Sequence, residues 1–123
     1  MRLEIDGTAY EFRFGMKFLR TINQKYSVDQ QAKLMGLNSG LDVVSMNFLR
    51  RDPEMLIDVL KIANETETPK VGQDTLDGYI EVNGVDELYE EVLNTLKESP
   101  SIGTAWKTAA NQLEENLKAE VNH

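Results

Sequence analysis

The side chains best suited to chemistry in this sequence are carboxylates. Glu87, Glu90 and Glu91 fall within one turn of a predicted helix, a spacing at which carboxylates can hold a hard cation. Carboxylate metal sites in helical bundles, however, combine inward-facing Glu with His from several helices. The three glutamates lie opposite an apolar stripe on the same predicted helix. We therefore interpret them as a solvated helix face and predict no metal site.

The sequence lacks the residue patterns that are typical of nucleophilic catalysis and of nucleotide binding. The chain has no Cys, and its single His is His123, the last residue, so neither a Cys–His nor a Ser–His pair is expected inside the fold. Gly36 and Gly40 are not followed by the Lys and Ser/Thr of a phosphate-binding loop. We predict no catalytic residues and no cofactor. An enzyme that uses carboxylates such as Asp58 or Glu87 is the least favoured hypothesis.

The net charge of −8 over 123 residues comes from the second half of the chain. Residues 1–62 hold nine Lys/Arg and eight Asp/Glu, whereas residues 63–123 hold four and thirteen. An acidic half without a basic stripe predicts no binding to nucleic acid, whose phosphates require Lys and Arg. No stretch approaches the roughly 20 apolar residues of a membrane span, and the first residues lack the apolar core of a signal peptide. With no Cys, the expected compartment is a reducing cytoplasm.

The elements that would position these residues begin with a hairpin. Residues 2–13 alternate apolar and polar side chains around Gly7, which suits a tight turn between two strands. Leu3 and Ile5 share one face of the first strand, where Tyr10 and Phe12 of the second strand can meet them. From Gly15 the apolar spacing becomes helical and continues to about residue 26.

Further helices account for most of the remaining chain. The strongest local signal is Asp52-Pro53-Glu54, an N-cap followed by proline at the first helical position. The helix after it is apolar on almost all sides, so we predict that it is the most buried. The other predicted helices run from a cap at Asn38 or Ser39 to Arg50-Arg51, from a cap at Asp74 or Thr75 through Ile80, over residues 85–98, and from about Ser101 towards Val121. The segment 29–33 fits either a helical turn or a loop.

This pattern predicts an α+β, mostly α fold in which a short N-terminal β-hairpin packs on a bundle of about five to six helices. We expect a single domain over residues 1–123, since a chain of this length buries one core. Within it lie the hairpin (1–13), a helical body (14–98) and a C-terminal amphipathic helix (101–121). The turn at residues 99–103 could act as a hinge, so this last helix is either part of the core or a docking element.

Apolar residues in the predicted helices are the candidates for partner binding. Methionine side chains adapt to irregular partners, although they also fill gaps in cores. The apolar stripe of the last helix is equally open to both interpretations. The predicted partner-binding residues are Met35, Met46, Phe48, Trp106, Ala109, Leu113 and Leu117.

Four segments in a particular order support a family resemblance. They are the hairpin over residues 3–12, the helix that begins at Phe14-Gly15-Met16 and runs to Lys25-Tyr26, the helix pair joined at residues 51–53, and the segment 76–81 followed by 86–93. With this order and spacing, residues 1–98 resemble the tail assembly chaperones of long-tailed phages and prophages of Gram-positive bacteria. Such proteins have no catalytic residues to transfer onto this sequence.

The resemblance implies a chaperone that coats the tape measure protein and keeps it soluble until tail-tube subunits polymerise around it. It also implies work in the cytoplasm of the infected or lysogenic host and absence from the mature virion. In this family a frameshifted longer form often recruits the tail tube protein, and a homo-oligomer is a further open expectation. The alternative from another class is a structural tail or head-completion component retained in the virion.

Overall fold

The N-terminal hairpin forms as predicted. The computed structural model describes residues 1–121, with side chains as far as Lys118, and its first elements are the antiparallel strands β1 (Arg2–Ile5) and β2 (Thr8–Glu11). Asp6 and Gly7 both have positive φ, 51° and 82°, as a two-residue type I′ turn requires. The register places Leu3 opposite Tyr10, and the buried residues Leu3, Ile5 and Phe12 attach the hairpin to the core.

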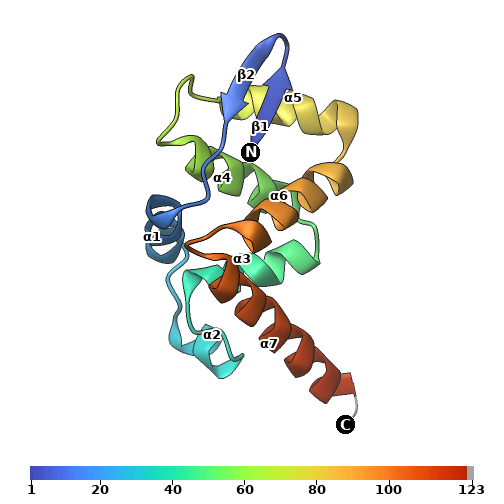
Figure 1. Cartoon of the computed structure of the whole chain (residues 1–123). Coiled ribbons are helices and arrows are strands. Elements are labelled where there is room, and N and C mark those ends of the chain that lie inside the picture. Colours follow the sequence, from blue (N-terminus) through green and yellow to red (C-terminus); the bar gives the residue numbers. More distant parts are fainter. Residues whose placement is uncertain (122–123) are drawn as a thin grey trace.

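Seven helices follow in the described residues. Their bounds are α1 (Met16–Lys25), α2 (Gln30–Leu34), α3 (Gly40–Leu49), α4 (Pro53–Asn64), α5 (Gln73–Asn83), α6 (Asp86–Glu98) and α7 (Gly103–Val121). The hairpin and α5 lie at one end of the molecule, and α2 and the last turns of α7 lie at the other (Figure 1). The mostly helical fold with an N-terminal hairpin is therefore confirmed.

Local capping explains where several helices begin. The Asp52 side chain accepts a hydrogen bond from the Met55 backbone N–H at 2.8 Å, and Pro53 occupies the first turn of α4, as predicted. Ser39 and Asp42 form a capping box at the start of α3. Asp29 caps α2 through the Ala32 N–H, so the segment left open between turn and loop is a short helix.

Two predicted helix starts are wrong. Neither Asp74 nor Thr75 caps α5: the N-cap is Gly72, and Asp74 lies in the first turn, where its negative charge suits the helix dipole. The last helix begins at Gly103 rather than Ser101. Just before it, the Ser99 hydroxyl accepts from the Ile102 N–H at 3.4 Å and donates to the Phe14 carbonyl at 2.8 Å, which ties the turn between α6 and α7 to the segment before α1.

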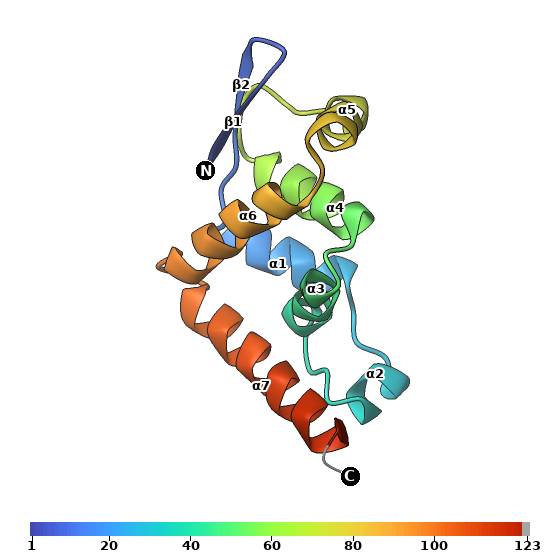
Figure 2. The same ribbon diagram turned by 90° about the vertical axis from the view of Figure 1, so that its right-hand side faces the viewer.

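Helix α4 lies between the end of the molecule that holds the hairpin and α5, and helices α1 and α3 (Figure 2). Eight of its twelve residues are buried, against five of ten in α3, which confirms the prediction that this helix is the most buried. Burial of its apolar side chains against neighbouring helices contributes to the hydrophobic driving force for the fold. At its end the buried Asn64 side chain donates to the carbonyls of Glu11 and Pro69 and accepts from the Val71 N–H.

Helices α1 and α3 approach each other closely at one point. A Cβ at Gly40 would lie 2.5 Å from the Ile22 carbonyl oxygen and 2.8 Å from the Asn23 Cα. The Asn23 side chain also accepts a hydrogen bond from the Leu41 N–H at 3.2 Å. Only glycine allows this backbone contact, so it fixes where α3 starts relative to α1.

Candidate functional site

The predicted partner-binding residues divide into a group within the core and a group that lines a groove. Phe48, Trp106 and Ala109 are at most 5% exposed. Trp106 packs edge-on against Phe48 at 5.1 Å between ring centroids, and Phe48 packs in the same way against Tyr89 at 4.8 Å. These aromatic rings join α3, α6 and α7. In this conformation the first half of α7 is therefore part of the core.

The other four predicted residues lie together around an open groove. Met35, Met46, Leu113 and Leu117 come from the end of α2, from α3 and from α7, and all four line one hollow of about 430 Å³. Leu117 is 50% exposed and Met35 58%. The structure thus gathers residues that are up to 82 positions apart in the sequence onto one surface.

Sequence reasoning missed the remaining lining residues of this groove. They are Leu34, Leu37, Leu49, Arg50 and Asn116. Leu34 is 88% exposed and Leu49 48%, which is unusual for large apolar side chains. The sequence carried a signal for them, since Leu49 and Arg50 follow Met46 by three and four positions and so share its side of a helix.

The groove is apolar, and one charge lies on its lining. Seven of the nine lining residues are Leu or Met, one is Asn116 and one is Arg50. Arg50 is exposed and takes part in no salt bridge among the residues described. The neighbouring Arg51, by contrast, pairs with Asp86 at 2.9 Å and with Glu90. The groove can therefore bury apolar side chains of a partner but offers no set of groups for bond-making chemistry.

The carboxylates considered for catalysis or metal binding have other surroundings. Glu87, Glu90 and Glu91 are exposed on α6. Asp58 accepts hydrogen bonds from Lys25, at 2.9 Å, and from the Tyr26 hydroxyl. Burial acts to raise the pKa of Asp58, but these two bonds outweigh it and hold the pKa below its usual value. Among the side chains that the structure describes, residues 1–118, no group of three His, Asp or Glu is placed to hold a metal ion.

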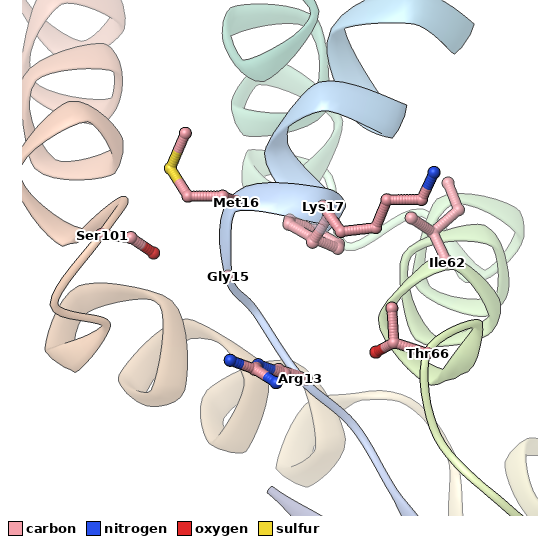
Figure 3. Close-up of a pocket in the computed structure, with 8 residues that line it drawn as sticks. Arg13, Gly15, Met16, Lys17, Ile62, Thr66 and Ser101 are labelled. Carbon is pink, nitrogen blue, oxygen red and sulfur yellow. The ribbon is translucent and has the colours of Figure 1, made fainter.

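A second hollow, of about 360 Å³, lies at the start of α1. Arg13, Lys17, Thr66 and Ser101 contribute its polar side chains, and Gly15 caps the helix without a side-chain hydrogen bond. The Arg13 guanidinium and the Lys17 ammonium extend in different directions and do not converge on one point (Figure 3). The hollow therefore lacks the arrangement of a bound-anion site or of an active site. His123 lies outside the described residues.

The fold and the groove together define a class: a small, mostly helical protein with an open apolar groove on its surface. In the part of the chain that is described, none of the helices combines the length and the apolarity needed to cross a membrane. The sequence matches the family model described as "Phage tail assembly chaperone protein, TAC" over residues 2–110. The chain belongs to the phage tail assembly chaperone family, whose members are not enzymes and bind phage tail components.

This match confirms the family that the order of the four segments indicated, and it extends beyond residue 98 into α7. Comparison with curated proteins and with solved structures gave no significant match.

Proposed function

We propose that this protein binds the tape measure protein of its phage and keeps it soluble while the tail tube assembles. The observation that supports the proposal is the apolar groove between α2, α3 and α7. A tape measure protein is a long helical chain with apolar stripes, and an amphipathic helix that enters a groove buries such a stripe. The acidic second half of the chaperone would then face water, and coated particles would repel one another.

Co-expression with the cognate tape measure protein tests this function. The chaperone should raise the soluble yield of the tape measure protein and co-purify with it. No gain in solubility together with no co-purification would contradict the proposal.

The groove itself is tested by a double variant, Leu34→Asp with Leu117→Asp. Both side chains are at least half exposed, so the variant should fold while losing the apolar docking surface. The matched control is Val82→Asp, since Val82 is 84% exposed but lies on α5, at the opposite end of the molecule. The double variant should lose the tape measure protein and the control should retain it. Equal solubilisation by both would show that another surface binds.

A chaperone leaves the tail before it is complete, so we expect the protein in the host cytoplasm and not in mature particles. Mass spectrometry of purified virions separates this role from that of a structural tail or head-completion component. A stoichiometric amount of this chain in the particles would contradict the chaperone role.

A further inference from the structure

We propose that the groove between α2, α3 and α7 selects an amphipathic helix that carries a carboxylate beside its apolar stripe, and that Arg50 pairs with this carboxylate. The inference rests on the proposed function and adds to it the chemistry of the partner segment. It follows from the shape of the two helical walls and from the charge on the lining.

The walls fit a helix. Helix α3 contributes Met46, Leu49 and Arg50, at positions i, i+3 and i+4, and α7 contributes Leu113, Asn116 and Leu117 at the same spacing. Each set is therefore one side of a helix, and the two sides form the walls of a channel. Side-chain ridges of a third helix pack into a channel of this kind, with apolar anchors every three or four residues.

Two apolar side chains of the lining are already buried by the protein itself. Leu37 is 3% exposed and Leu113 9%, and both lie outside the main hydrophobic cluster of the protein. The exposed Leu34 and Met35 form the third side of the groove. A bound helix would join these separate apolar groups into one buried cluster.

The charge on the lining specifies the partner further. Arg50 is the only charged residue among the nine that line the groove, although the protein carries a net charge of −8. A partner helix that covers the groove removes water from this guanidinium, and an unpaired charge there opposes binding. A carboxylate on the partner offsets this loss and can accept two hydrogen bonds from the planar guanidinium.

The test uses two synthetic helical peptides of about 18 residues, a length at which Ala-rich helices form in water. Both carry the same leucine stripe, and three flanking positions on each side of the stripe are Glu in one peptide and Gln in the other. Binding to the full chain is measured by fluorescence anisotropy in 0.15 M salt, which screens the net charge of the protein beyond about 8 Å. The wild type should bind the Glu peptide about threefold to fivefold more tightly than the Gln peptide, the range of a partly exposed ion pair.

Arg50→Gln should abolish this preference and keep binding of the Gln peptide. The matched control is Arg20→Gln, because Arg20 is exposed on α1 and does not line the groove. Equal affinities of the wild type for both peptides, or a preference that survives Arg50→Gln, would overturn the inference. So would a dimer in sedimentation that Leu117→Asp dissociates, since a second copy would then occupy the groove.

The two proposals fail separately. If the chaperone solubilises the tape measure protein but binds neither peptide, the inference about Arg50 is wrong and the proposed function stands. If the tape measure protein is not solubilised, the proposed function is wrong, whatever the peptides do.

Discussion

The region around α4 and the groove between α2, α3 and α7 contain similar apolar residues but bury them to different degrees. Leu60 of α4 is fully buried, whereas Leu34 at the end of α2 is 88% exposed. Buried polar groups around α4 are also paired, as the three hydrogen bonds of Asn64 illustrate. The first region therefore stabilises the fold, whereas the second leaves apolar side chains exposed, as is typical of interaction surfaces.

The largest effect is expected from truncation of a buried leucine side chain on α4. Leu60→Ala should lower the free energy of unfolding by about 2–5 kcal/mol, since the removed methyl groups leave a cavity in a packed core. Urea unfolding followed by circular dichroism measures the loss. A change below about 1 kcal/mol would show that α4 is less tightly packed than its burial indicates.

Removal of the buried amide of Asn64 should have the next largest effect. Asn64→Ala leaves the Val71 N–H without its acceptor and two carbonyls without a donor, so we expect a loss of about 2–3 kcal/mol. Asn94→Ala is the matched control, because Asn94 is exposed on α6. Equal stability of the two variants would contradict the role of Asn64 in holding the hairpin against α4.

A smaller effect is expected at Asp58, on the outer side of α4. Hydrogen bonds from Tyr26 and Lys25 hold its pKa below the unfolded value of about 4, so the stabilisation is present above that pH and is lost as the pH falls through the lower folded value. Because the pair is partly exposed, we expect less than about 1 kcal/mol. The advantage of the wild type over Asp58→Asn should shrink between pH 7 and pH 3 in urea unfolding. An unchanged difference would contradict this assignment, and exposed Asp74→Asn serves as the control.

The smallest effect should come from the groove. Leu34→Ala is the counterpart of Leu60→Ala. It should change the free energy of unfolding by no more than about 0.5 kcal/mol, because the folded protein buries little of the Leu34 side chain. The measurement is again urea unfolding. A loss close to that of Leu60→Ala would erase the distinction between the two regions.

The sequence allowed the elements with strong local signals to be predicted. Asp52 and Pro53 marked the start of α4, and the turn at Gly7 marked the hairpin. The predicted cap of α5 was wrong. Asp74 is a residue type that often caps helices, but here it lies inside the first turn and Gly72 is the N-cap. Segment 29–33 was too short for periodicity to distinguish a helix from a loop.

The groove could be predicted only in part. Periodicity marks Trp106 and Leu117 as members of one apolar stripe on α7, yet Trp106 is 1% exposed and Leu117 50%. The difference arises because Phe48 covers the first half of the helix and no other part of the described chain covers the second half to the same degree. Which part of a stripe is covered depends on contacts between distant segments, and these are not encoded in local spacing.

The backbone contact at Gly40 has a consequence for how the groove can adapt. At that point the start of α3, the helix that carries Met46, is held against α1. Helix α2 has five residues, none of them buried, and is followed by Gly36 with a positive φ of 85°. Under the proposed function, a partner helix would therefore contact one wall that is packed against α1 and one wall, α2, that few contacts hold in place, so that anchor side chains of different size could be accommodated.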